Sequence, residues 1–202
     1  GADMIATLDG FSREDVDAFA VESQRRAAEA WAEGRFKGAI VPVRDVLGDI
    51  VLDHDEYIRP GTSLADLAKL KPAFEGFGKA GFEAVAKDRY AEIEELSYVH
   101  HGGNSSGIVD GAGLVMIGSK EFGAKAGLKP RARVRAYANI GSEPTIMLTA
   151  PTAVCQKALG KAGMTKDDVD LWELNEAFAS VVMRFMNEMG VPHDKMNVNG
   201  GA

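Results

Sequence analysis

The sequence predicts a protein of the α/β class, and three observations support that prediction. Of its 202 residues, 46% are hydrophobic and 26% are charged, which is ordinary composition for a folded globular chain. Short apolar runs of strand character alternate with segments in which apolar residues recur at helical spacing. In the second half the order is strand, helix, strand, helix, which is typical of strands covered by helices.

The charge balance argues against a nucleic-acid partner. The chain carries 23 basic and 30 acidic side chains, a net charge of −7, and its basic residues form no block. A phosphate backbone needs a basic stripe that displaces its counterions. The longest nearly apolar run, 111–118, is also far shorter than the roughly 20 residues of a membrane helix. We therefore expect a soluble protein with neither nucleic acid nor membrane as a partner.

Cysteine usage and the N-terminal residues favour the cytoplasm. The single cysteine, Cys155, excludes an internal disulfide and fits a reducing compartment. The first ten residues have neither the basic region nor the apolar region of a secretory signal. A cytoplasmic location is therefore the expectation.

Composition and periodicity divide the chain near residue 100. In the first part, Ser12 and Asp15 form a capping-box pattern, and a Gly48-Asp49 turn signal separates two short apolar runs. The elements expected there are a helix over 12–33, a hairpin from 40–43 and 50–52, a short helix over 63–70 and an amphipathic segment over 84–96.

The second part, 101–202, begins with a glycine-rich polar turn. Proline in the first turn and Gly163 just past the end mark one helix, and a second continues to Met189 before Gly190. The elements expected there are strands over 114–117, 131–137 and 169–174, helices over 151–162 and from the NEAFAS run to 189, and a capped turn over 165–168. In such a layer, active groups are expected where strands end and helices begin.

Asn175 lies where the apolar VDLWEL run gives way to a helical pattern. An amide at such a turn can orient water or a carbonyl oxygen, and the free N–H groups of the following helical turn favour negative charge. The alternative is a helix-capping asparagine with no further role. Ser105 and Ser106, beside Gly102 and Gly103, form a second polar turn at which a ligand could approach the backbone, with a plain loop as the alternative.

Other polar residues are weaker candidates. The 53–56 run (DHDE) could supply metal ligands, but neighbouring strand side chains point to opposite faces, so a solvated hairpin end is favoured and no metal site is predicted. His100 and His101 are adjacent, which is poor geometry for one metal, and we expect a local structural role. Cys155 lies within a predicted helix and is expected to be a buried, inert thiol.

Four blocks of the sequence resemble the thiolases, acyl-CoA acetyltransferases that make or cleave 3-oxoacyl-CoA thioesters. In chain order the blocks are SREDVDAFAVESQRRAAEA, GNSSGIVDGA, DLWELNEAFA and NVNGGA. Their order and spacing follow the thiolase pattern over almost the entire chain. The resemblance implies a partial thiolase-like fold, with the loop domain over 1–100 and the start of the C-terminal α/β half over 101–202.

The resemblance implies Claisen condensation or thiolytic cleavage through a cysteine acyl-enzyme, within fatty-acid and lipid metabolism. A low-pKa thiolate would attack the thioester, and a second thiol would move a proton at the α-carbon. Thiolases carry the nucleophilic cysteine upstream of the part resembled here, a GHP histidine after NGGA, and a second cysteine near the C-terminus. The chain has none of the three, because Cys155, His100 and His101 match none of these positions. We expect a middle fragment of a thiolase that is inactive alone.

The resemblance assigns roles to seven positions. Asn175 resembles the asparagine that holds the water of an oxyanion hole. Six others resemble contacts to coenzyme A or its acyl group, which would be a substrate and not a permanently bound cofactor: Arg59 and Leu70 around the adenine end, Gly102 and Ser106 along the pantetheine arm, and Ala177 and Phe178 beside the acyl and pantetheine groups.

Two departures limit the substrate assignment. The segment between Phe74 and Gly103 is longer than in short-chain biosynthetic thiolases, which leaves the acyl-chain length open. Asp66 stands where an adenine-side serine is usual. A different class of function stays open as well, namely a non-catalytic CoA-binding or dimerisation module with a thiolase-derived fold.

Truncation of a layered fold would leave unpaired strand edges and apolar helix faces. We therefore expect this chain to associate with another copy, as a homo-oligomer, or with the remainder of a thiolase chain.

Overall fold

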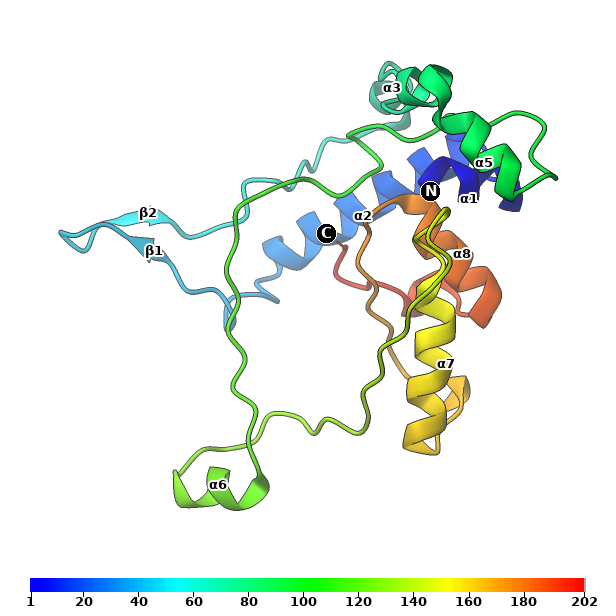
Figure 1. Cartoon of the computed structure of the whole chain (residues 1–202). Helices are drawn as coiled ribbons and strands as arrows, with labels where there is room; N and C mark the ends of the chain where they lie inside the picture. Colours follow the sequence, from blue (N-terminus) through cyan, green and yellow to red (C-terminus); the bar gives the residue numbers. More distant parts are fainter. Residues whose placement is uncertain (202) are drawn as a thin grey trace.

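The structure is a computed structural model that describes residues 1–201, and Figure 1 shows a helical body from which two extended parts project. The α-helices are α1 (Ala2–Asp9), α2 (Arg13–Ala32), α3 (Leu64–Leu67), α4 (Glu75–Phe77), α5 (Glu83–Arg89), α6 (Lys120–Lys125), α7 (Ala150–Ala162) and α8 (Ala179–Met189). The strands are β1 (Val43–Arg44) and β2 (Ile50–Leu52), and a π-helical turn covers Gly78–Phe82. Short 3₁₀ turns cover Lys166–Asp168 and His193–Lys195. No helix within residues 1–201 has the length and apolar character needed to cross a membrane.

The long helix α2 forms as the sequence predicts. The Ser12 hydroxyl oxygen accepts a hydrogen bond from the backbone N–H of Asp15, and the Ser12 N–H donates to the Asp15 carboxylate at 2.8 Å. This reciprocal pair satisfies two N–H groups that a helix start otherwise leaves without partners. Val16 and Phe19 on one face are buried and pack against α8 and Trp172.

The two helices predicted for the second half, α7 and α8, end on glycine, as expected. Gly163 follows α7 and Gly190 follows α8, with φ of 65° and 63°. This left-handed conformation carries little steric cost for glycine, which is why it suits the end of a helix. The start of α8 differs from the prediction, because the chain stays extended through Asn175 and the helix begins only at Ala179.

The buried core consists of two adjoining clusters. The first joins α2 to α8 and to residues on either side of α8, namely Trp172, Val191 and Met196. In this cluster the Trp172 ring packs edge-to-face on Phe185, with 5.7 Å between the ring centres. The second joins α1, the 86–98 segment, Ile146 and Val181 of α8. Helix α1, which was not among the elements predicted from the sequence, packs directly against α8. Both clusters draw residues from both sides of residue 100, where the predicted domain boundary stays a prediction.

Strand pairing within residues 1–201 is limited to the antiparallel hairpin of β1 and β2 and two isolated bridges. The predicted strands over 114–117 and 131–137 are wrong for this chain, and the strand over 169–174 is reduced to a parallel bridge between Trp172 and Met196. Leu114 is 97% exposed and Val134 is 65% exposed. A strand needs a neighbouring backbone for its N–H and C=O groups, and no described segment pairs with these two runs.

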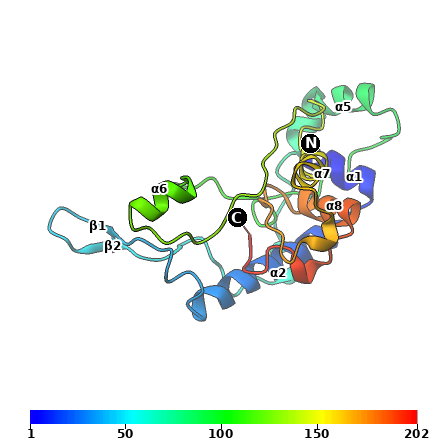
Figure 2. The same cartoon turned by 90° about the horizontal axis from the view of Figure 1, so that it is seen from below.

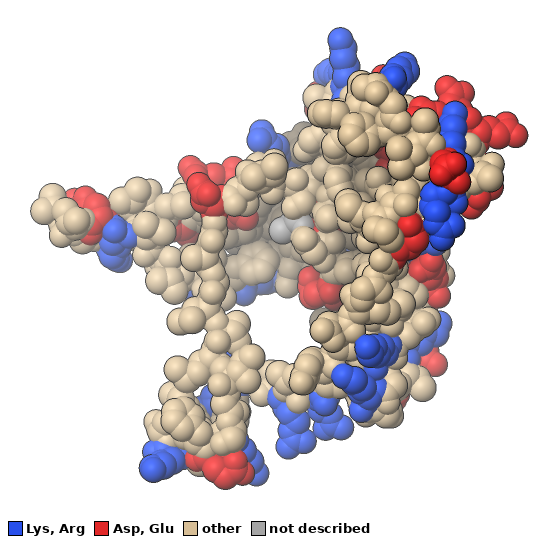
Figure 3. Space-filling view, in the orientation of Figure 1, with Lys and Arg blue, Asp and Glu red and all other residues tan. Residues whose placement is uncertain are grey.

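The two unpaired runs belong to one segment, 107–149, which we call the arc. It leaves the body after Ser106, passes through α6 and returns to α7 (Figure 1). In Figure 1 and in the view from below in Figure 2, α6 and the hairpin both lie away from α1 and α8. The space-filling view in Figure 3 shows an opening between the arc and the body. The arc therefore touches the body mainly at its two ends.

Candidate functional site

The four sequence blocks that resemble the thiolases meet at one cavity of about 510 Å³ beside α2. Four parts of the chain line it, namely α2 with the adjoining 55–58 segment, the 104–109 turn, the 173–176 segment and the 199–201 turn. Ser106 and Asn175, which the sequence analysis singled out separately, both lie in this lining. The fold thus brings together residues that are about 70 positions apart in the chain.

Backbone hydrogen bonds join the GNSSG turn to the NEAFA segment. The Ser106 N–H donates to the Ala177 carbonyl at 3.0 Å, and the Ala179 N–H donates to the Asn104 carbonyl at 3.1 Å. These two bonds form an antiparallel bridge between Ser105 and Phe178. The position of Ser106 relative to the residues after Asn175 is therefore fixed by main-chain geometry rather than by side-chain packing alone.

A buried asparagine holds the next part of the cavity wall. The Asn197 side-chain oxygen accepts from the Leu174 N–H at 2.8 Å, and its NH₂ group donates to the Leu174 carbonyl and to Glu176 Oε1, each at 2.8 Å. The residue is 2% exposed and has φ of 45°, a left-handed conformation that asparagine tolerates better than most residues. From the sequence, Asn197 is predicted only as part of the NVNGGA block, because its contacts with Leu174 and Glu176 become visible only in the fold.

Glu176 links that wall to α2. Its other oxygen, Oε2, accepts from the Ser23 hydroxyl at 2.6 Å, and the same hydroxyl oxygen accepts from the Gly201 N–H at 3.1 Å. Burial raises the pKa of Glu176, and the hydrogen bonds from Ser23 and Asn197 oppose that rise. Burial and the nearby Glu176 also raise the pKa of Glu173. Glu173 and Glu176 are thus partly desolvated.

The charge of the lining suits an uncharged part of a ligand. Asp55, Glu173 and Glu176 line the cavity, and the described lining includes no lysine or arginine. A phosphate group would be repelled there. Arg59 lies just beyond the lining residues Tyr57 and Ile58, with its guanidinium carbon 5.5 Å from the centre of the Tyr57 ring. A cation therefore lies next to the cavity, one residue outside its lining.

Asn175 is exposed and lies four residues before α8 begins. The residue at the N-cap position of α8 is Phe178, so Asn175 does not cap this helix. Within residues 1–201 its side-chain amide makes no hydrogen bond, and it borders the cavity. Its two N–H donors are available to a ligand.

The other five predicted contact residues lie outside the described lining of this cavity. Arg59 is exposed and its N–H donates to Gln24 at 2.7 Å, while Leu70 is 43% exposed and its carbonyl accepts from Arg13 at 3.0 Å. Gly102 is exposed at the start of the serine turn. Ala177 and Phe178 are half-buried beside that turn.

Phe178 lies between two aromatic neighbours. Its ring packs edge-on against Phe74 at 5.9 Å and against His100 at 5.4 Å. His100 is fully buried, and its Nδ1 lies 2.7 Å from the Asp3 carboxylate. The neighbouring His101 is equally buried and lies 2.8 Å from Asp17 through Nε2. Both histidines therefore make structural contacts, but their carboxylate partners lie 97 and 84 positions away in the chain, so the contacts are not local as expected.

The acidic residues named from the sequence lie on the surface. His54 Nδ1 lies 3.0 Å from Asp53 in the exposed hairpin end. Asp66, which stands where thiolases usually carry serine, contacts Lys69 at 2.8 Å and accepts from the Ser63 hydroxyl at 2.5 Å. These contacts lower the pKa of Asp66, Lys69 having the larger effect.

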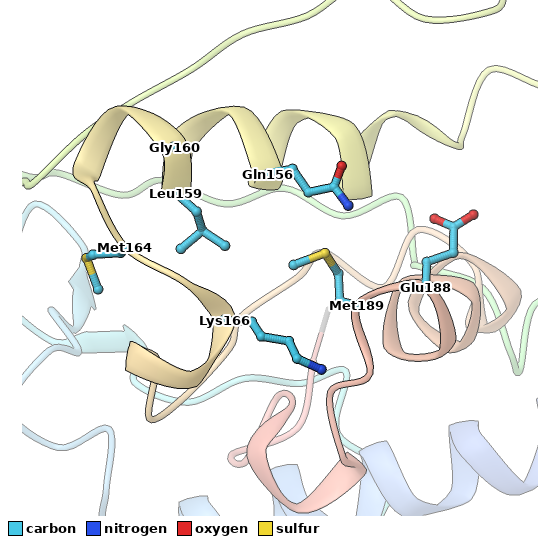
Figure 4. A pocket seen from close by; sticks show the side chains of 7 residues that line it. All are labelled: Gln156, Leu159, Gly160, Met164, Lys166, Glu188 and Met189. Atoms are coloured by element: carbon cyan, nitrogen blue, oxygen red, sulfur yellow. The ribbon is translucent and has the colours of Figure 1, made fainter.

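A second cavity, of about 460 Å³, lies between α7 and α8 and holds none of the predicted site residues. Figure 4 shows Leu159 and Gln156 on α7 facing Met189 on α8, with Lys166 on the turn between the helices. The nearby Cys155 is half-buried, and burial raises the pKa of its thiol. An activated cysteine nucleophile needs a lowered pKa, so this environment fits an inert thiol.

Comparison with known proteins identifies the family. The profile described as "Thiolase, N-terminal domain" matches residues 1–84, and "Thiolase, C-terminal domain" matches residues 128–202. The acetyl-CoA acetyltransferase of Chromobacterium violaceum is 41% identical over the whole chain, which covers 47% of that protein. The 3-ketoacyl-CoA thiolase of Bacillus subtilis is 38% identical, and the chain covers 49% of it. The chain spans about half the length of the curated relatives it matches.

Comparison with solved structures indicates the same family. Human mitochondrial 3-ketoacyl-CoA thiolase matches the whole chain with a TM-score of 0.84 at 33% identity, and the chain covers 46% of it. The same human protein in complex with CoA matches with a TM-score of 0.83, again at 33% identity, and the chain covers 45% of it. The chain belongs to the thiolase family and has a partial thiolase-like α/β fold.

Proposed function

We propose that this chain forms the oxyanion-hole and pantetheine-binding part of an acyl-CoA acyltransferase of the thiolase class. The observation that carries the proposal is the shared cavity of Ser106 and Asn175, held by the bridge between the GNSSG and NEAFA segments. The reaction is thiolytic cleavage or Claisen condensation of 3-oxoacyl-CoA and acetyl-CoA, in fatty-acid and lipid metabolism. Its cysteine nucleophile comes from outside these 202 residues.

Asn175 fits the part of that chemistry in which negative charge on the thioester oxygen is stabilised. Negative charge develops on the thioester oxygen when a thiolate attacks, and a fixed donor at that point stabilises the transition state. The amide of Asn175 borders the cavity with both N–H donors free of partners among residues 1–201. Its role is to hold a water molecule or the oxygen itself, with no bond made or broken at Asn175.

The surroundings of the cavity support coenzyme A as the ligand class. The pantetheine arm is uncharged, which fits a lining that lacks basic residues, and Ser106 offers a hydroxyl to it. The phosphates need a cation, and Arg59 supplies one beside the cavity, with Leu70, Gly102, Ala177 and Phe178 as further contacts. A related thiolase structure contains CoA.

The arc supports association with another chain. Its residues Leu114, Val115 and Ile117 are between 79% and 97% exposed, although they have strand character. We infer that the arc is covered by the remainder of a thiolase chain or by a second copy of this one. Cytoplasm is the proposed compartment.

The test compares the full reading frame with this chain alone, using thiolysis of acetoacetyl-CoA. We expect activity in the full protein, none in the 202-residue chain, and a fall of about 10²-fold or more in kcat for Asn175→Asp in the full protein, because a carboxylate repels the developing charge. Asn187→Asp, on the exposed side of α8, is the control and should keep full activity.

Turnover by the isolated chain would contradict these assignments, as would an unaffected Asn175→Asp variant. A full protein that binds CoA without turnover would instead favour a non-catalytic CoA-binding module.

A further inference from the structure

His101 lies directly beneath the serine turn of the proposed acyl-CoA site, and its hydrogen bonds determine its protonation. The ring is 2% exposed. Nε2 lies 2.8 Å from Asp17 Oδ1, and Nδ1 accepts from the Gly103 N–H at 3.0 Å. A carboxylate only accepts and a backbone N–H only donates. The ring is therefore neutral, with its hydrogen on Nε2 and a lone pair on Nδ1.

The same carboxylate anchors the rest of the turn. Asp17 Oδ1 also accepts from the Asn104 side-chain NH₂ at 2.8 Å, and Asp17 Oδ2 accepts from Arg13 Nε at 2.8 Å. The Asn104 side-chain oxygen accepts from the His101 N–H at 2.9 Å, and the Ser105 hydroxyl donates to the His101 carbonyl at 2.8 Å. One buried carboxylate on α2 thus holds the turn through both His101 and Asn104.

The turn can follow only a narrow path. A Cβ atom at Gly103 would lie 2.6 Å from the Leu67 side chain and 3.0 Å from the His101 ring, so the backbone passes tightly between them. Beyond Gly103, the carbonyl of Asn104 and the N–H of Ser106 bond to the 177–179 segment. The His101 ring therefore helps to fix the distance between Ser106 and the wall that bears Asn175.

We propose that His101 is a positioning residue for the acyl-CoA site, whose neutral ring holds the 102–106 turn so that Ser106 faces the cavity. This rests on the proposed function for the assignment of the ligand. The histidine itself makes no contact with the ligand. No other residue of the turn accepts the Gly103 N–H within residues 1–201.

Protonation of the ring would release the turn. Nδ1 would then carry a hydrogen that faces the Gly103 N–H, and two donors cannot bond. The charged and titratable groups facing the ring are Asp17 and Arg13 from α2 and His100 from its own segment. Helices α3 and α8 approach the turn with the apolar residues Leu67 and Ala179. Burial lowers the pKa of His101, with Asp17 opposing, so release occurs on the acid side of the ordinary histidine range.

Two substitutions each remove one of the two hydrogen bonds made by the His101 ring. His101→Asn can accept the Gly103 N–H but is too short to reach Asp17, whereas His101→Gln can reach Asp17 but leaves the Gly103 N–H without an acceptor. His54→Asn, in the exposed hairpin end, is the matched control. CoA affinity of the 202-residue chain is measured by calorimetry from pH 7.5 to 4.5, and the amides of Gly103 and Ser106 are followed by NMR together with the His101 ring nitrogens.

We expect wild type and His54→Asn to bind CoA equally and to lose affinity as the His101 ring titrates. His101→Gln should bind about tenfold more weakly at pH 7.5 and lack that pH step. His101→Asn should fall between them. In wild type, the Gly103 and Ser106 amide shifts should follow the ring nitrogens with the same midpoint.

The role of His101 and the assignment of CoA as the ligand can be contradicted separately. CoA binding by wild type together with an unchanged His101→Gln affinity, or amides that ignore the ring, would overturn the role of His101 alone. No CoA binding by wild type, with Gly103 and Ser106 still following the ring, would overturn the ligand assignment and leave the positioning of the turn by His101 established.

Discussion

Large apolar residues are buried in the body of this chain, whereas those in the middle of the arc are exposed. In the body, Val16, Val182 and Met196 are fully buried, and the polar groups among them are joined by short hydrogen bonds. In the arc, Leu114, Val115 and Ile117 are equally apolar and lie in solvent. The difference shows that apolar strand character marks a segment for burial, while burial itself depends on a partner within reach.

Truncation of a large aromatic side chain should separate the two regions most strongly. Phe185 is 4% exposed and packs on Trp172, so Phe185→Ala should lower the free energy of unfolding by about 3 to 5 kcal/mol. Phe122 in α6 is 56% exposed, so Phe122→Ala should change that free energy by less than about 0.5 kcal/mol. Urea unfolding followed by circular dichroism measures both. Equal losses would remove the distinction between body and arc.

A smaller effect is expected for the polar part of the body. Asn197→Ala removes three hydrogen bonds and leaves the N–H and C=O groups of the half-buried Leu174 without these partners, which should cost about 2 kcal/mol. Asn199, two residues away, accepts one exposed hydrogen bond from Arg35, and Asn199→Ala should cost well under about 1 kcal/mol. Urea midpoints of the two variants give the comparison. An Asn197→Ala variant with nearly the stability of wild type would contradict this expectation, because it would show that water replaces the three lost hydrogen bonds.

The smallest effect concerns Glu176 and depends on pH. Burial raises the pKa of Glu176 above the ordinary range of a glutamate, so the folded state holds a proton more tightly than the unfolded state. Stability should therefore fall as pH rises from 4.5 through the folded pKa. Glu176→Gln has no such proton and should lack this pH dependence, although its NH₂ group cannot accept one of the two hydrogen bonds that Ser23 and Asn197 donate to the carboxylate. Thermal midpoints at pH 4.5, 6 and 7.5 measure it.

Glu56→Gln, in the exposed hairpin end, should leave the same profile unchanged. A Glu176→Gln variant that keeps the pH dependence of wild type would contradict the assignment of that dependence to Glu176.

Sequence reasoning succeeded where structure is decided locally. The Ser12 and Asp15 pattern gave the start of α2, Ser63 the start of α3, and Gly163 and Gly190 the ends of α7 and α8. Each signal acts within one helical turn. It failed for 114–117 and 131–137, because a strand is defined by a partner that sequence pattern does not supply.

The candidate site was predictable in part. The family resemblance placed Asn175 and Ser106 in one site, and both line one cavity. Neither Glu176 nor Asn197 was singled out, since their importance comes from contacts with Ser23 and Leu174 that lie 153 and 23 positions away. His101 was assigned only a structural role, because its bonds to Asp17 and Gly103 become visible only when α2 and the turn are placed together.

Amide hydrogen exchange on the 202-residue chain tests the central claim most directly, namely that the body holds the site turns without help from the arc. For the chain in its monomeric form we expect slow exchange at Ser106, Ala179 and Asn197, whose N–H groups are bonded in the body, and exchange near the unfolded rate across 111–118 and 131–137. Equal protection of the arc, or unprotected amides at Ser106 and Asn197, would contradict it.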